Sequence, residues 1–143
     1  MTDSADIFKI FEHDENFMGI MKRLLEASME ASFNGVMITE AGPGYPIVYV
    51  NPALCEMTGY APKELLGQSP AMLQGAATDP WVLDQLKEKI EAGDLFHGQT
   101  ANYRKNGAEF TMEWKIGPIR NDQGTITHYL AIQREVQPAS GDV

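Results

Sequence analysis

The side chains of this 143-residue chain that most often do chemistry are few and far apart. His13, His97 and His128 show none of the close spacings to a second histidine or a cysteine that metal sites use. Cys55 is the only cysteine, so no internal disulfide can form, which is typical of a reducing compartment. The sequence has no glycine-rich phosphate loop, nucleophile elbow or plausible catalytic triad. It therefore predicts neither a metal centre nor an enzyme.

The charge of the chain also limits its partners. Its formal net charge is −9, from 20 acidic and 11 basic residues. Because phosphate groups repel an acidic surface, this charge argues against nucleic acid and an anionic membrane surface as partners. No apolar run approaches the roughly 20 residues of a membrane-spanning helix, and the acidic start MTDSADIFKIF is not a secretory signal. We expect a cytoplasmic protein.

Two helical pieces are expected over residues 4–31. Apolar residues recur there at mostly three- and four-residue steps with charges between them, and the segment 13–16 interrupts the pattern. Ser4 could cap the first piece and Asn16 the second. Such an apolar stripe must be buried, either against its own domain or in a dimer interface.

From Asn34 onward the pattern changes to strands and short helices. Two β-type runs flank the Gly/Pro cluster AGPGYP, which indicates a hairpin with a long connection. Short helical patterns occupy residues 51–92. In the last of them Asp79 is a plausible N-cap, Pro80 takes the first helical position and Gly93 lies just past the end.

Three further strands are expected at residues 96–105, 109–119 and 125–136, and the Asn-Gly step at 106–107 is a strong hairpin signal. Two strands, several short helices and a three-strand meander predict an α+β domain. Its antiparallel sheet should carry helices on one side.

Four strings carry a more specific signal, and they run in this order: YVNPALCEMTGYAPKELLG at 49–67, GQSPAMLQG at 67–75, NYRKNG at 102–107 and AIQREV at 131–136. In order and spacing they resemble the PAS domain family and, within it, the flavin-binding light-oxygen-voltage (LOV) branch. The second string aligns without gaps on that branch's G-x-N-C-R-F-L-Q-G signature.

The resemblance covers about residues 30–136 and implies a PAS fold with a five-stranded antiparallel sheet and short helices on one face. The corresponding organisation is an N-terminal helical cap at 1–31, a PAS/LOV-like domain at 32–136 and a flexible tail at 137–143.

The resemblance also implies a flavin, FMN or FAD, held by side-chain amides. Gln74, Asn102 and Gln133 match family positions whose amides hydrogen-bond the polar edge of the isoalloxazine ring, and the family's residue at Gln133 faces ring N5. An amide suits that edge because it offers both a donor and an acceptor. The alternatives are an outward strand position for Gln133, a turn position for Asn102 and a helical cap for Gln74.

This chain departs from the family at the position of the photoactive cysteine, which is Pro70 here. Proline supplies no nucleophile, so a cysteinyl adduct cannot form at this position. We interpret Cys55, on a different helix, as a small buried apolar residue. If a flavin is bound, one-electron chemistry remains, and the candidate electron donors are Trp81, Trp114, Tyr103 and Tyr129. Such aromatic residues more often serve only as core or strand surface.

Other departures concern the phosphate and the polarity of the pocket. Ser69 and Ala71 replace the signature asparagine and arginine, and the family's second arginine falls near Asp84, with Lys87 the nearest cation. Losing both arginines weakens the case for a bound phosphate. The remaining pocket positions that we assign to the cofactor are Ser69, Leu73 and Met112, the last in place of a ring-contacting asparagine.

We therefore predict a sensory PAS domain that binds a flavin and reports redox state, or light through flavin reduction. It would form a homodimer through its N-terminal helices and act on an effector protein or domain. The alternative is a PAS module that has lost flavin and binds another small ligand or serves only in dimerisation.

Overall fold

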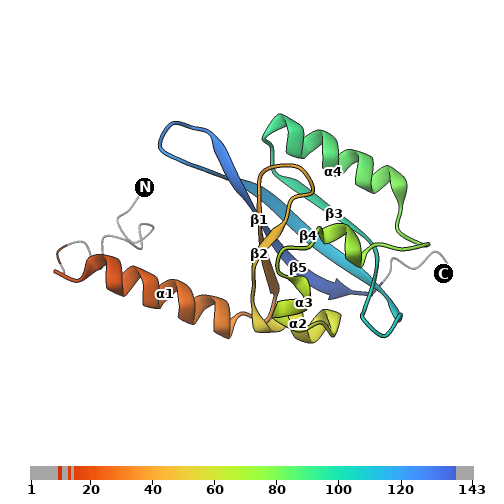
Figure 1. Ribbon diagram of the computed structural model, residues 1–143, viewed down its shortest axis with the longest axis horizontal. Coiled ribbons are helices and arrows are strands. Elements are labelled where there is room, and N and C mark those ends of the chain that lie inside the picture. Colours follow the sequence, from red (N-terminus) through yellow and green to blue (C-terminus); the bar gives the residue numbers. More distant parts are fainter. Residues whose placement is uncertain (1–9, 11–12, 14, 138–143) are drawn as a thin grey trace. The chain divides into compact units, whose positions relative to one another are not determined.

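The computed structural model describes Ile10, His13 and residues 15–137 of the chain (Figure 1). Most of the first predicted helical piece and all but Gln137 of the predicted tail lie outside the described residues. The chain forms two compact units, of which one ends at Ser32 and the other begins at Phe33.

The helix α1, Phe17–Ala31, is the second of the two predicted N-terminal pieces. Asn16 occupies the predicted N-cap position, but its side chain accepts no capping hydrogen bond. None of the residues of α1 is buried, and Met18 and Leu25 are largely exposed. No helix among the described residues combines the length and the apolar character that crossing a bilayer requires.

The second unit is built on an antiparallel sheet of five strands, and all five were predicted. The strands are β1 Gly35–Glu40, β2 Ile47–Val50, β3 Phe96–Tyr103, β4 Glu109–Arg120 and β5 Ile126–Val136. Their order in the sheet is β2-β1-β5-β4-β3, so that β1 and β5, from the two ends of the domain, are neighbours. The long strands β4 and β5 lie side by side in Figure 1. The predicted α+β class with a five-stranded antiparallel sheet is confirmed.

The chain between β2 and β3 supplies the helices of this unit. They are α2 Pro52–Thr58, α3 Pro62–Leu65, the single 3-10 turn η3 Pro70–Leu73, and α4 Pro80–Ala92 (Figure 1). The capping of α4 follows the prediction. The Asp79 side chain accepts a hydrogen bond from the Trp81 N–H at 2.9 Å, and Gly93 ends the helix with φ of 75°.

Asn51 fixes α2 to the sheet. Its side chain is completely buried, and its Oδ1 accepts hydrogen bonds from the N–H groups of Leu54 at 3.1 Å and Val36 at 2.8 Å. Its Nδ2 donates to the Asn34 carbonyl at 3.0 Å. One amide therefore caps a helix and satisfies the backbone at the start of β1.

The core lies between the inner face of the sheet and these helices. Its buried members are Met37, Ile47, Leu54, Leu65, Leu73, Phe96, Phe110, Met112, Trp114 and Ala131. Cys55 is half-buried and packs against this cluster, in agreement with the structural role expected for it.

Candidate ligand cavity

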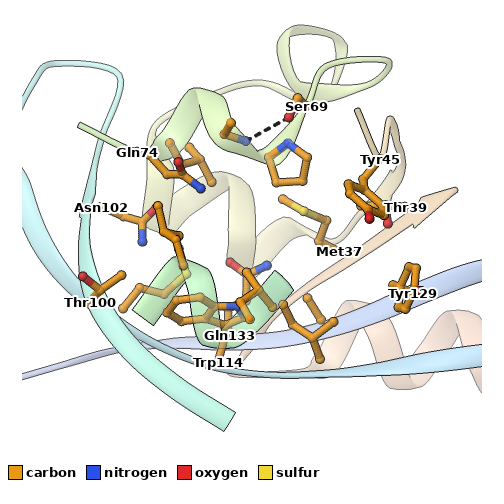
Figure 2. Close-up of a pocket in the computed structure, with 18 of the residues that line it drawn as sticks. Met37, Thr39, Tyr45, Ser69, Gln74, Thr100, Asn102, Trp114, Tyr129 and Gln133 are labelled. Carbon is orange, nitrogen blue, oxygen red and sulfur yellow. Dashed lines mark hydrogen bonds between the residues drawn. The ribbon is translucent and has the colours of Figure 1, made fainter. Parts of the chain in front are cut away.

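A cavity of about 370 Å³ opens between the inner face of the sheet and the segments η3 and α4 (Figure 2). This volume lies in the range of small-molecule sites in proteins. The structure brings the six residues assigned to the cofactor to the wall of this one cavity, together with Pro70: Ser69, Leu73, Gln74, Asn102, Met112 and Gln133.

The sheet positions one half of the wall by alternation. Side chains of a strand point alternately to its two faces, so every second residue of β4 and β5 faces the cavity. On β4 these are Met112, Trp114 and Ile116, and on β5 they are Tyr129, Ala131 and Gln133. The pairing places Trp114 opposite Gln133 and Thr100 opposite Met112.

Gln74 directly follows η3, and the segment 75–79 after it is fixed to β3 by hydrogen bonds. The Thr78 hydroxyl donates to the Ala101 carbonyl at 2.7 Å, and the Asp79 N–H donates to the Thr100 hydroxyl at 2.7 Å. The Ala77 N–H donates to the Tyr103 hydroxyl at 2.8 Å.

Gly75 is required for this close approach, because a Cβ at that position would overlap the ring of Tyr103. At the other end of η3, the Ser69 hydroxyl accepts from the Ala71 N–H at 3.1 Å and so caps the turn (Figure 2).

The amide of Gln133 is the most exceptional polar group of the cavity. The residue is only 4% exposed, and its Oε1 is the one buried side-chain nitrogen or oxygen atom without a hydrogen-bond partner among the described residues. An unsatisfied buried acceptor costs about 1–3 kcal/mol. Within the same part of the chain, the side-chain amides of Gln74 and Asn102 also form no hydrogen bond. Three amides are therefore available to a ligand.

The cavity has two chemically different ends. In Figure 2, Gln74 and Asn102 lie at one end, whereas Tyr45, Thr39 and Tyr129 lie at the other. Tyr45 meets Tyr129 edge to face with ring centroids 5.9 Å apart. Tyr45 also has φ of 49°, the one positive φ of a non-glycine residue in the described chain, which is an uncommon conformation.

The wall is otherwise mostly apolar, and Lys87 of α4 is its one cation within the described chain. From the sequence, Lys87 was notable only as the cation nearest to the missing arginines. Tyr45, from the Gly/Pro cluster between β1 and β2, also lies in the wall.

Thr39, Thr78 and Thr100 line the cavity and were missed. The signal for Thr100 was available, because it stands two residues before Asn102 on the same strand and must share its face. Of the four aromatic residues considered as electron donors, Trp114 and Tyr129 line the cavity, but Trp81 and Tyr103 do not.

The one thiol of the chain is also remote from this wall. Cys55 is not among the residues that line the cavity. Burial raises the pKa of its thiol above the ordinary value, which disfavours the reactive thiolate. Among the described residues, no three His, Cys, Asp or Glu side chains gather in a way that could hold a metal ion.

A second hollow, called here the outer groove, lies on the opposite face of the sheet. It is lined by residues of β3, β4 and β5 together with Asn34 and Leu95, and it shares Trp114 and Gln133 with the cavity. In the outer groove Glu113 accepts from His97 Nε2 at 2.7 Å and from Arg134 at 2.6 Å. These two partners lower the pKa of the Glu113 carboxyl below its usual value.

Comparison with known proteins places the site in a family context. The model of the PAS domain matches residues 33–138. Phototropin-1A of Oryza sativa subsp. japonica is 32% identical over 113 residues, which are 78% of this chain and 12% of that protein. Blue-light-activated histidine kinase 1 of Erythrobacter litoralis (strain HTCC2594) is 38% identical over 94 residues, 66% of this chain and 26% of the kinase.

The nitrogen fixation regulatory protein of Klebsiella oxytoca is 34% identical over 90 residues, 63% of this chain and 18% of that regulator. The chain therefore spans only between 12% and 26% of the length of these three relatives.

Solved structures agree with the sequence relatives. A light-oxygen-voltage domain studied with a flavin analogue superposes with a TM-score of 0.73 at 30% identity, covering 84% of this chain and 86% of that one. An RNA-binding light-oxygen-voltage receptor superposes with a TM-score of 0.78 at 30% identity, covering 83% of this chain and 34% of that one.

Proposed function

Since the chain belongs to the PAS domain family and, within it, to the LOV branch, we propose that it is a sensory domain that holds a flavin in the cavity described above. The observation that carries this proposal is the buried, unpartnered carbonyl oxygen of Gln133 among three amides of one wall. A group that is costly to leave unsatisfied in the empty protein gains most when a ligand supplies the missing partner.

The donor set fits the polar edge of an isoalloxazine ring. That edge carries both N–H and C=O groups. The amides of Gln74, Asn102 and Gln133 can accept hydrogen bonds from the former and donate hydrogen bonds to the latter. Met112, Leu73 and Ala131 leave an apolar surface that suits the rest of a flat aromatic ring. A bound flavin would supply the absorption of blue light and the uptake of electrons.

Pro70 and Cys55 support a signal that does not depend on a cysteinyl adduct. Pro70 lines the cavity where the family signature has its cysteine, and the one cysteine of the chain lies in α2 outside the cavity wall. Adduct chemistry therefore has no thiol within this wall. The proposed signal is instead a change in the redox state of the flavin, reported through the hydrogen bonds of Gln133.

The proposed output is a change in contacts with a partner. The relative from Erythrobacter litoralis is by name a blue-light-activated histidine kinase, and the chain covers 26% of it. By analogy, this domain would control an effector protein or domain rather than catalyse a reaction itself. A homodimer formed through the N-terminal helices and a cytoplasmic location remain predictions, as does the expectation that this acidic chain does not bind nucleic acid.

The second candidate is a PAS module that has exchanged flavin for another small ligand. Met112 favours this candidate because it replaces an amide and offers the flavin ring no hydrogen-bond donor. The cation content of the described wall favours it too, because Lys87 alone stands in place of two arginines that would bind a phosphate.

Absorption spectroscopy distinguishes the two candidates. The purified protein, incubated with FMN, FAD or riboflavin and freed of excess, should retain a yellow chromophore with the structured blue band of a protein-bound flavin. A protein that stays colourless with all three flavins contradicts the proposal and leaves the second candidate.

A further inference from the structure

The two tryptophans of the chain have contrasting surroundings. Trp114 lines the cavity and is only 7% exposed, whereas Trp81, at the start of α4, is 67% exposed and lies outside the cavity wall. Trp114 also faces Gln133 across the β4–β5 pair. A ligand that reaches the Gln133 amide from within the cavity therefore also reaches the indole.

The indole is held in place by its neighbours on β3. The rings of Trp114 and Phe96 pack with centroids 5.6 Å apart and planes tilted by 55°. Gly98 is the register partner of Trp114, and a Cβ at position 98 would come within 2.5 Å of the Phe96 ring. Glycine at this position thus makes room for the ring that packs against the indole.

The indole N–H of Trp114 has no hydrogen-bond partner among the residues that the structure describes. Buried tryptophans usually find an acceptor for the indole N–H, but that of Trp114 forms no hydrogen bond with the described part of the chain. The indole is therefore an electron-rich ring at the cavity wall that the protein fixes by packing alone.

The competing electron donors are less suited. Oxidation of a phenol requires release of its proton, and the Tyr129 hydroxyl donates to the Ile90 carbonyl at 3.2 Å, a group that is not a base. Burial further raises the pKa of Tyr129. Tyr45 lies beside Tyr129 at the end of the cavity away from Gln74 and Asn102 (Figure 2). Indole can lose an electron without losing a proton, so Trp114 does not need a base.

We infer that Trp114 is the electron donor to the photoexcited flavin in this protein, an inference that rests on the flavin binding proposed above. Light excites the bound flavin, and one electron moves from the indole to it. The indole is then oxidised by one electron and the flavin reduced by one. In the dark the electron returns and restores both, so no external oxidant or reductant is needed.

Flavin fluorescence measures this step directly, because electron transfer from the indole competes with emission. We would load the whole chain with FMN and compare fluorescence lifetimes of the bound flavin in the wild type, Trp114→Phe and the matched control Trp81→Phe. We expect a strongly shortened lifetime in the wild type, a several-fold longer lifetime in Trp114→Phe, and the wild-type lifetime in Trp81→Phe. Equal lifetimes in all three proteins would overturn the inference.

A second measurement on the wild type does not depend on the folding of any variant. After a short blue pulse, the transient absorption of an oxidised indole should rise as the excited flavin decays, and then disappear as the electron returns. An excited flavin that decays without this signal would overturn the inference but leave flavin binding intact. A wild type that retains no FMN would overturn both proposals, so the two failures are distinguishable.

Discussion

Trp114 on β4 and Gln133 on β5 are register partners in adjacent strands, and both residues line the same cavity. One contributes an aromatic ring whose N–H has no partner within the described chain, and the other contributes a buried carbonyl oxygen that also lacks one. Because the two groups differ in chemistry, substitutions can separate their roles. Replacing the indole should change how excitation decays, whereas replacing the amide should change the hydrogen bonding of the bound ligand.

Gln133→Leu should have opposite effects on the empty and the loaded protein. Removing an unsatisfied buried acceptor should raise the unfolding free energy of the flavin-free protein by about 1 kcal/mol. Losing a hydrogen bond to the ligand should weaken FMN binding by about fivefold to tenfold and shift the flavin absorption band. Urea denaturation and FMN titration measure the two effects. The control Gln99→Leu, at an exposed position of β3, should change neither. A Gln133→Leu protein with an unaltered flavin spectrum would contradict the placement of this residue.

Pro70→Cys should restore a photochemical thiol. Residue 70 lines the cavity at the first position of η3, where the added backbone N–H needs no partner within the turn. Blue light should bleach the visible flavin band of this variant, and the band should recover in the dark. The wild type retains Cys55 and should not bleach in this way, and neither should Pro70→Ser. Bleaching and dark recovery in the wild type would show that Cys55 reaches the flavin.

Lys87→Gln tests how much the cavity wall contributes to binding the phosphate group of FMN. Since Lys87 is the one cation of the described wall, FMN and riboflavin should bind the wild type with affinities within about tenfold of each other. The substitution should weaken FMN binding by roughly threefold and leave riboflavin binding unchanged. The control is Lys89→Gln, on the same helix but outside the wall. If FMN binds more than about a hundredfold tighter than riboflavin, a phosphate site exists that these residues do not explain.

Asn51→Ala should be the most destabilising of these changes. It removes the cap of α2 and leaves the buried N–H of Val36 without an acceptor, which should cost about 3 kcal/mol of unfolding free energy. Asn106→Ala removes one side-chain acceptor in an exposed turn and should cost less than about 1 kcal/mol. Denaturant titrations of the two variants compare these costs. Equal losses would mean that the Asn51 network contributes little.

The stability of the folded protein should depend on pH through the carboxyl group of Glu113. Its pKa is lowered in the folded protein by hydrogen bonds from His97 and Arg134, relative to an ordinary value of 4.5. The charged form is thus favoured by folding. The stabilisation is present above pH 4.5 and is lost as the pH falls through the lower folded pKa. Melting curves should show that wild type and Glu113→Gln differ at neutral pH and converge in acid. A constant difference across this range would contradict the prediction.

Local signals in the sequence were sufficient for the individual elements of the fold. The cap at Asp79, the turn at Gly93 and the Asn-Gly hairpin each depend on a few neighbouring residues, and the structure contains all three. The neighbours of β1 could not be derived in this way. Pairing of Met37 with Ala131 joins residues far apart in the chain, and only the resemblance to a family supplied that order.

In the wall of the cavity, too, some residues could be identified from local sequence and others could not. Gln74, Asn102 and Gln133 were identified from short strings, and the structure gathers them from one loop and two strands. Thr39 and Thr78 had no such string. Thr39 reaches the wall because β1 lies beside β5, and Thr78 because its hydroxyl bonds to the Ala101 carbonyl. Both depend on tertiary contacts.

At residues 114 and 133 a single thickness of backbone separates the cavity from the outer groove. Trp114 and Gln133 line both hollows, so a change at either position should alter the two hollows together. Thr100 borders the cavity alone and Lys115 the outer groove alone. Comparing the response to light of a Thr100 variant with that of a Lys115 variant would therefore distinguish a signal that begins in the cavity from one that begins in the outer groove.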